Sequence, residues 1–319
     1  MDTSHQRNAD QGQSKRPGQT SGNLLQPQLL AQLGNLELVA KAVVDGFFTG
    51  MHRSPFFGFS QEFAEYKAYN DGDDPRFIDW NVYARTDRTY IKRFLGETNT
   101  ALNLMLDVSG SMAYQTDATS KLLYGKYICA SLGYLARKQH DAIGMTLFDD
   151  KIRDVLPPAS HPDTFYRMLA LLERAEAREG TQISDSLNHL TEALTKRGIF
   201  VMISDFYCDP DALNRQLQAL VNRGHEVVLF HLLDRSEYNP AEHVKKMRSP
   251  STLRDMESGA QVKVSPEYLR DTYPQRIRSH IETLDKTALR SGFTYVPCNT
   301  SAPLDELLQK YLLLRQQRR

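Results

Sequence analysis

The sequence predicts an α/β protein with a doubly wound, mostly parallel sheet and helices on both of its faces. The run 200–203 is continuously apolar, as expected of a strand that is buried on both sides. Segments with apolar residues at helical spacing separate such runs along the second half of the chain. This alternation of strand and helix is typical of parallel sheets covered by helices.

Composition favours a soluble, cytoplasmic protein. The 39 basic and 39 acidic residues balance, so global charge gives no reason to expect binding to nucleic acid or to a membrane surface. No apolar stretch is long enough to form a membrane segment, and the N-terminus lacks the apolar core of a secretory signal. Cys129, Cys208 and Cys298 are far apart and odd in number, which is typical of a reducing compartment.

Three parts are expected along the chain. Residues 1–24 are polar, and we expect a disordered tail there because too little apolar surface is available for burial. Residues 25–100 form an N-terminal block that begins with a helix over 26–47, which Gly34 interrupts. The rest of the block is rich in aromatic residues, and we expect these to pack in the core and against the following part. Short strands are expected near 61–69 and 88–96.

Residues 101–319 carry the alternating pattern of the α/β part. Strands are expected at 102–106, 142–148, 152–156, 200–203, 227–233 and 293–296. Helices are expected at 119–138, 164–172, 183–194, 210–221, 277–288 and 304–314. A β-hairpin inserted near 250–265 breaks the rhythm, because two short strand-like runs flank the turn at 257–259.

An acidic cluster precedes the α/β part, at Asp71, Asp73, Asp74 and Asp79. The spacing lacks the closing acidic residue of an EF-hand loop, so we favour a structural loop over a cation site or a docking surface. In that interpretation Asp73, Asp74 and Asp79 pair with Arg76, Arg85 or Arg88 and accept hydrogen bonds from backbone amides.

The run 104–112 carries the clearest chemical signal. An apolar strand leads directly into Asp107, Ser109 and Ser111, whose side chains alternate and can converge on one point. One carboxylate and two hydroxyls suit Mg²⁺ or Mn²⁺ rather than zinc or copper. Because Asp and Ser are also favoured helix caps, the run alone leaves a metal site and a helix N-terminus equally open.

Two later residues extend this set. Thr181 follows Gly180 on a loop before an expected helix, and Asp205 comes directly after the strand 200–203. Ligands of doubly wound sheets bind at the carboxyl ends of the strands, so these side chains are expected near Asp107. Mg²⁺ prefers six ligands, and an open position would attract the carboxylate of an Asp or Glu on another protein.

The five positions Asp107, Ser109, Ser111, Thr181 and Asp205 resemble the metal-ion-dependent adhesion site of von Willebrand factor A-type domains. Upstream, the segments 62–66, 72–80 and 84–85 resemble the signature of the bacterial "domain of unknown function 58" family. Together the two resemblances cover residues from about 35 to 315. They imply a von Willebrand factor A-like fold and action beside a MoxR-type AAA+ ATPase in remodelling or assembling other proteins.

Two functions remain open. We favour a Mg²⁺-dependent protein-binding module, an adaptor or co-chaperone, over an enzyme. The alternative is a metal-dependent hydrolase or phosphatase that uses the same ion to activate water or orient phosphate. The sequence contains no GxxxxGK[ST], GxGxxG after a strand, or GxSxG motif, and no general base stands out near the site, so no catalytic residue is assigned.

Overall fold

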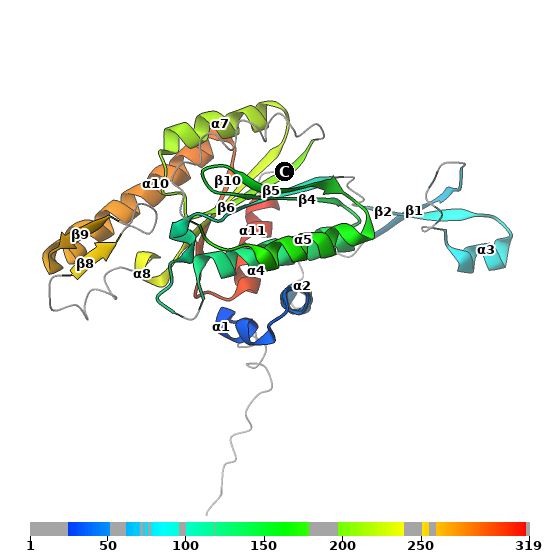
Figure 1. The fold of residues 1–319 in the computed structure, drawn as a ribbon. Coiled ribbons are helices and arrows are strands. Elements are labelled where there is room, and N and C mark those ends of the chain that lie inside the picture. Colours follow the sequence, from blue (N-terminus) through cyan, green and yellow to red (C-terminus); the bar gives the residue numbers. More distant parts are fainter. Residues whose placement is uncertain are drawn as a thin grey trace, which may run out of the picture.

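A six-stranded sheet, in the order β10-β7-β6-β3-β4-β5, forms the centre of the protein (Figure 1). Five strands are parallel, and β5 (Ile152–Ala159) pairs antiparallel with β4 at one edge. The parallel strands are β3 (Ala101–Asp107), β4 (Ala142–Phe148), β6 (Gly198–Ser204), β7 (Glu226–Leu233) and β10 (Thr294–Asn299). The computed structural model describes residues 25–51, 62–70, 73, 75, 78–95, 100–117, 119–178, 197–238, 251–254 and 260–316.

Helices cover both faces of this sheet, which confirms the predicted doubly wound fold class. One face carries α4 (Lys121–Lys138), α5 (Pro162–Arg174) and α11 (Leu304–Gln316). The other carries α7 (Pro210–Asn222) and α10 (Tyr273–Ser291). The helix expected at 183–194 lies outside the described residues.

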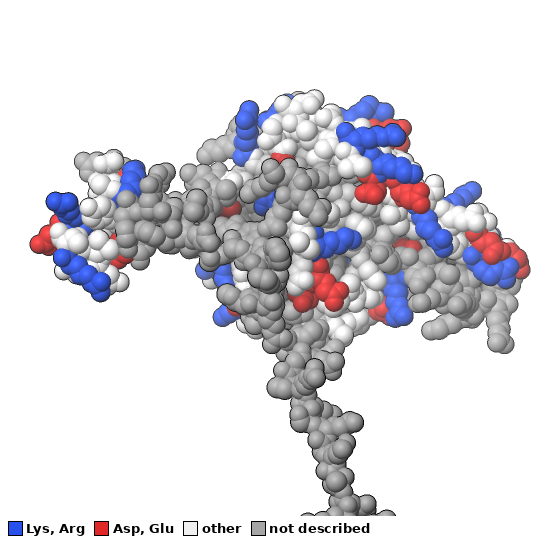
Figure 2. Space-filling model, turned by 180° about the vertical axis from the view of Figure 1, so that it is seen from behind, with Lys and Arg blue, Asp and Glu red and all other residues white. Residues whose placement is uncertain are grey.

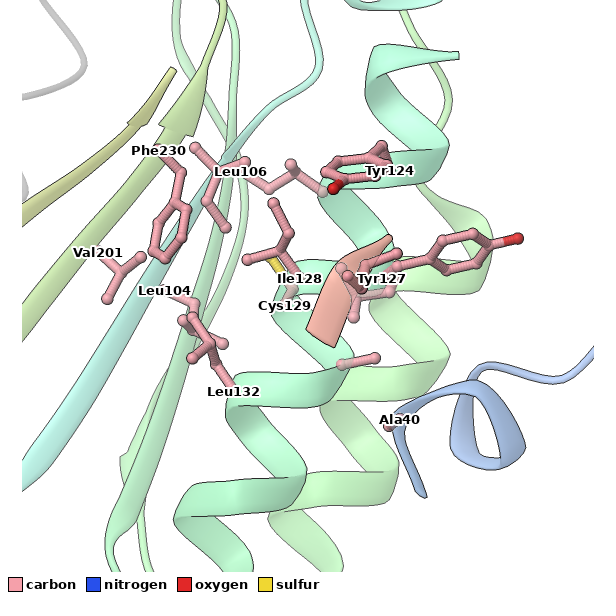
Figure 3. Close-up of a cluster of buried hydrophobic side chains, with 14 of the residues drawn as sticks. Ala40, Leu104, Leu106, Tyr124, Tyr127, Ile128, Cys129, Leu132, Val201 and Phe230 are labelled. Carbon is pink, nitrogen blue, oxygen red and sulfur yellow. The ribbon is translucent and has the colours of Figure 1, made fainter. Parts of the chain in front are cut away.

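The central strand β3 shows why both faces need a cover. Leu104 and Leu106 belong to the core cluster on the α4 side, and Met105 belongs to the cluster on the α7 side. This follows from the alternation of side chains along a strand. Figure 3 shows Leu104 and Leu106 facing Ile128 of α4 across this core.

Gly125 lets α4 approach the sheet closely. A β-carbon at this position would lie 2.7 Å from Cδ1 of Leu106 and 3.3 Å from side-chain atoms of Ile203 and Leu232. These residues come from the three neighbouring strands β3, β6 and β7. The first turns of α4 are therefore held against the strands that end at the candidate site.

The N-terminal helix is interrupted at Gly34, as predicted. α1 (Pro27–Leu30) and the 3₁₀ turn η1 (Ala31–Leu33) lead to Gly34, which adopts a left-handed φ of 62°. α2 (Leu36–Met51) follows and packs on α4. The helix continues past its predicted end at residue 47 to Met51. The predicted tail at 1–24 lies outside the described residues.

A hairpin arm projects from the body (Figure 1). Its antiparallel strands β1 (Glu62–Ala68) and β2 (Tyr90–Leu95) confirm the two strands predicted here. Between them lies a helix that was not predicted, α3 (Trp80–Thr86). Trp80 and Tyr83 on this helix are 63% and 41% exposed, so the expectation that the aromatic residues pack in the core is wrong for these two.

The acidic cluster on the arm is engaged in local hydrogen bonds. Asp79 is the N-cap of α3 and accepts from the backbone N–H groups of Asn81 and Val82 at 2.9 and 3.3 Å. Asp73 accepts from the ammonium of Lys67 at 2.9 Å and from the backbone N–H of Asn70 at 3.0 Å. Backbone capping is thus confirmed for these two residues, and Lys67 is an ion-pair partner of Asp73 that was not predicted. Asp71, Asp74 and Arg76 lie outside the described residues.

The predicted hairpin near 250–265 is present as β8 (Ser251–Arg254) and β9 (Gln261–Val264). The π-helical turn η4 (Tyr268–Thr272) leads from it into α10. Lys and Arg are interspersed with Asp and Glu over the face shown in Figure 2. Across the described part of the chain, no helix combines the length and apolar character needed to cross a membrane. The division of the chain at residues 24 and 100 stays a prediction.

Candidate cation site

Asp107 is the last residue of β3, and its side chain is fixed from two sides. Its Oδ1 accepts a hydrogen bond from the backbone N–H of Ser109 at 2.8 Å. Its Oδ2 accepts from the hydroxyl of Ser204 on the neighbouring strand β6 at 2.6 Å. The residue is 1% exposed. The carboxylate therefore has one orientation, which both strands determine.

The two serines of the same turn lie side by side. The Oγ atoms of Ser109 and Ser111 are 3.1 Å apart, at the start of the 3₁₀ turn η3 (Gly110–Ala113). Ser109 occupies the N-cap position of this turn, but its side chain makes no capping hydrogen bond. The long helix α4 is capped instead by Ser120, whose Oγ accepts from the N–H of Leu123 at 3.1 Å. Helix capping, the alternative left open by the sequence, does not account for the Ser109 hydroxyl.

Asp205 follows β6 and lies beside Asp107 because of the sheet register. Leu106 pairs with Ile203, so the residues after this pair, Asp107 and Ser204, are level at the ends of the two strands. Asp205 comes next and is 2% exposed. Burial, followed by repulsion from Asp205, raises the pKa of Asp107 from 3.8 to about 7.

The structure thus brings together Asp107, Ser109, Ser111 and Asp205, whereas Thr181 lies outside the described residues. Among the described residues, no group of three or more His, Cys, Asp and Glu side chains is arranged to hold a metal ion. A cation here would depend on hydroxyl ligands as well as carboxylates. Two buried carboxylates with adjacent hydroxyls fit a hard cation such as Mg²⁺ or Mn²⁺ and do not fit zinc or copper.

A buried lysine reaches the same place and was not predicted. Nζ of Lys121, the first residue of α4, lies 2.9 Å from Oδ2 of Asp205 and 2.9 Å from Oε1 of Glu237. The Tyr207 hydroxyl also donates to Oε1 of Glu237, at 2.8 Å. Burial disfavours the ammonium, but its attraction to Asp205 and Glu237 is stronger, so the pKa of Lys121 is raised. A lysine in the first turn of a helix, where the dipole disfavours cations, is the signal that could have found it.

Asp234 is a second residue that the sequence analysis missed. It follows β7 directly and accepts from the backbone N–H and the hydroxyl of Thr116, at 2.9 and 2.5 Å. It also accepts from the backbone N–H and the hydroxyl of Ser236, both at 2.8 Å. Burial alone would raise the pKa of Asp234, but these hydrogen bonds lower it. An acid directly after a buried strand was the available signal, as it was for Asp205.

A hollow of about 190 Å³ adjoins the turn at Val108. Its wall carries three arginines, Arg153, Arg174 and Arg178, together with Asp154, Glu176 and apolar residues. Arg178 is tied to the turn, because its backbone N–H donates to the carbonyl oxygen of Val108 at 2.8 Å. The surface beside the candidate site therefore presents guanidinium groups.

Comparison with known proteins gives the following matches. The profile of the family described as "Protein of unknown function DUF58" matches residues 65–283. Uncharacterized protein Rv1480 of Mycobacterium tuberculosis and uncharacterized protein Mb1516 of Mycobacterium bovis are each 27% identical over 281 residues, or 86% of both chains.

The solved structures that match this chain share little sequence with it. The conserved hypothetical protein BatB of Bacteroides thetaiotaomicron is 17% identical, with a TM-score of 0.45 over 68% of this chain and 99% of that one. The SpRpn10 VWA domain is 12% identical, with a TM-score of 0.39 over 66% of this chain and 94% of that one.

Proposed function

We propose that this chain, which belongs to the family of proteins of unknown function DUF58, is a protein-interaction module that binds its partner through a divalent cation. The cation, Mg²⁺ or Mn²⁺, would be held by Asp107, Ser109, Ser111, Thr181 and Asp205. The observation that carries the proposal is the convergence of Asp107, two hydroxyls and Asp205 at the carboxyl edge of the sheet.

The chemistry of this donor set explains why a partner would bind. A divalent ion held by two carboxylates and neutral hydroxyls keeps affinity for one more oxygen ligand. An Asp or Glu side chain of another protein supplies that ligand. Arg174 and Arg178 are exposed beside the site and can pair with acidic residues around that ligand, although Glu176 and Asp154 share the same wall.

We further propose that the chain acts as an adaptor or co-chaperone for a MoxR-type AAA+ ATPase in the cytoplasm. This part rests on the family resemblance. In that role the chain would link the ATPase to the proteins that it remodels, and the carboxylate ligand would come from the ATPase or from its client.

Isothermal titration calorimetry with Mg²⁺ and Mn²⁺ tests the site directly. We expect saturable binding to the full chain and loss of that binding in Asp107→Ala. Asp211→Asn is the matched control, because it removes an exposed carboxylate in the first turn of α7, near Asp205 in the sequence. Equal binding by wild type and Asp107→Ala would contradict the proposal.

Co-elution with a purified MoxR-type ATPase tests the partner. We expect the complex to form with wild type and with Asp211→Asn, and to be lost with Asp107→Ala. The variant is a cleaner test than EDTA, because EDTA also removes the Mg²⁺ that the ATPase needs for its nucleotide. Turnover of a generic phosphoester in excess Mg²⁺, if it required Asp107, would favour the hydrolase alternative instead.

A further inference from the structure

Lys121 carries a charge in the interior of the protein. Its side chain is 1% exposed, and its ammonium lies between Asp205 and Glu237, at 2.9 Å from each. The rings of Tyr207 and Tyr114 lie 4.9 and 5.5 Å from Nζ and complete its surroundings. Burying an ammonium is costly unless it is paired, so both carboxylates are needed to hold it.

Glu237 is itself fixed in place. Its Oε1 accepts from Lys121 and from the Tyr207 hydroxyl, at 2.9 and 2.8 Å. Its Oε2 accepts from the backbone N–H of Asp234 at 2.8 Å. All four groups come from the carboxyl edge of the sheet and from the start of α4. The position of the ammonium is therefore determined by the fold rather than by a flexible surface contact.

The ammonium touches a candidate ligand of the cation site. Lys121 binds Oδ2 of Asp205, which leaves Oδ1 as the oxygen of that carboxylate that Lys121 does not engage. Because the ammonium competes for Oδ2, this carboxylate is better placed to give one oxygen to a metal ion than to give both. Ca²⁺ takes six to eight oxygens and often binds a carboxylate through both, whereas Mg²⁺ takes six ligands at shorter distances and binds a carboxylate through one oxygen.

We propose that Lys121 is a positioning residue that restricts Asp205 to one oxygen and so makes the site selective for Mg²⁺ over Ca²⁺. This inference rests on the proposed function, because it needs a cation at Asp107 and Asp205. It adds a specificity determinant outside the five predicted ligands.

The test is calorimetric titration of Mg²⁺ and of Ca²⁺ into three full-length variants. Lys121→Met removes the ammonium and nearly preserves its length. Lys121→Met/Glu237→Gln removes one charge of each sign, so the buried charge stays the same while Asp205 is released. If Lys121→Met alone fails to fold, the test can still be made with this double variant, because its net buried charge equals that of wild type. Glu237→Gln is the control, because Lys121 then remains on Asp205.

We expect the ratio of Ca²⁺ to Mg²⁺ affinity to rise about tenfold in both variants that lack Lys121. In Glu237→Gln the ratio should stay within about twofold of wild type. A lysine with a purely structural role would change the unfolding temperature without changing this ratio. Circular dichroism at the titration temperature establishes that each variant is folded.

Two failures can be told apart. Asp107-dependent Mg²⁺ binding by wild type, with an unchanged ratio in the double variant, would overturn the role of Lys121 and leave the proposed function standing. Absence of Asp107-dependent binding in wild type would overturn both.

Discussion

Replacing Asp107 by asparagine is expected to stabilise the cation-free protein. Asp107 is 1% exposed, and burial followed by repulsion from Asp205 raises its pKa from 3.8 to about 7. Between these values the folded chain binds more protons than the unfolded chain, so the free energy of unfolding falls as the pH rises. Asparagine has no charge. Its amide oxygen can accept from the Ser109 N–H, and its amide nitrogen can donate to the Ser204 hydroxyl oxygen, which reverses the direction of that second bond.

The size of the effect follows from the change in pKa. A rise from 3.8 to about 7 corresponds to about 4 kcal/mol against the ionised form in the folded state. Part of this belongs to the pair, because two interacting carboxyls titrate together. We expect Asp107→Asn to raise the free energy of unfolding by about 2–4 kcal/mol at about pH 8. The gain should be largely gone near about pH 3, which lies below both pKa values, so that Asp107 is mostly protonated in the folded and in the unfolded state.

Urea unfolding in EDTA, followed by far-UV circular dichroism across this pH range, measures the difference. The denaturant slope should be the same for both proteins, because the fold is unchanged. Saturating Mg²⁺ should stabilise wild type and not the variant. The difference in free energy of unfolding between the two proteins should therefore become smaller. Asp211→Asn serves again as the exposed-carboxylate control. The reasoning would be refuted if Asp107→Asn were less stable than wild type at about pH 8. It would also be refuted if the difference in free energy of unfolding between the two proteins did not depend on pH.

Three further changes test the fold by the same unfolding assay. Gly198→Ala should cost about 2–3 kcal/mol, because a β-carbon would overlap the backbone carbonyl of Ala101 on the next strand; an unchanged midpoint would contradict this packing. Ser120→Ala should cost about 1 kcal/mol through loss of the cap that accepts from the N–H of Leu123; a neutral result would mean that the cap does not form. Trp80→Ala should change stability by less than about 0.5 kcal/mol, since Trp80 is 63% exposed; a large loss would place its ring in a core.

The sheet could be predicted because each of its strands has a local sequence signal. Residues 200–203 are apolar without a break, and the strand there is buried on both faces. The arm was harder. α3 has seven residues, too few for a clear helical period, and none of them is buried. Its aromatic residues suggested a core because burial is the usual fate of Trp and Tyr side chains, and composition does not say which residues an arm exposes.

The site could be predicted in part, for a geometric reason. Parallel strands place their carboxyl ends at one edge, so Asp107 and Asp205 could be expected together from their positions after two buried strands. The ion pairs of Lys121 could not be predicted. They join residues that are 84 and 116 positions apart, on elements whose packing the sequence does not reveal. The close approach of α4 at Gly125, one turn after Lys121, holds the start of that helix against the strands.

The acids at this edge differ in how their charge is balanced. Asp234 accepts four hydrogen bonds from Thr116 and Ser236, which lower its pKa, and Asp205 has the ammonium of Lys121. Asp107 has hydrogen bonds to Ser109 and Ser204, yet its pKa is raised. A cation at this edge would therefore offset the cost of the buried negative charge more at Asp107 than at Asp205 or Asp234. Asn in place of Asp234 should then leave the Mg²⁺ response of unfolding intact, and loss of that response would place the cation at Asp234 instead.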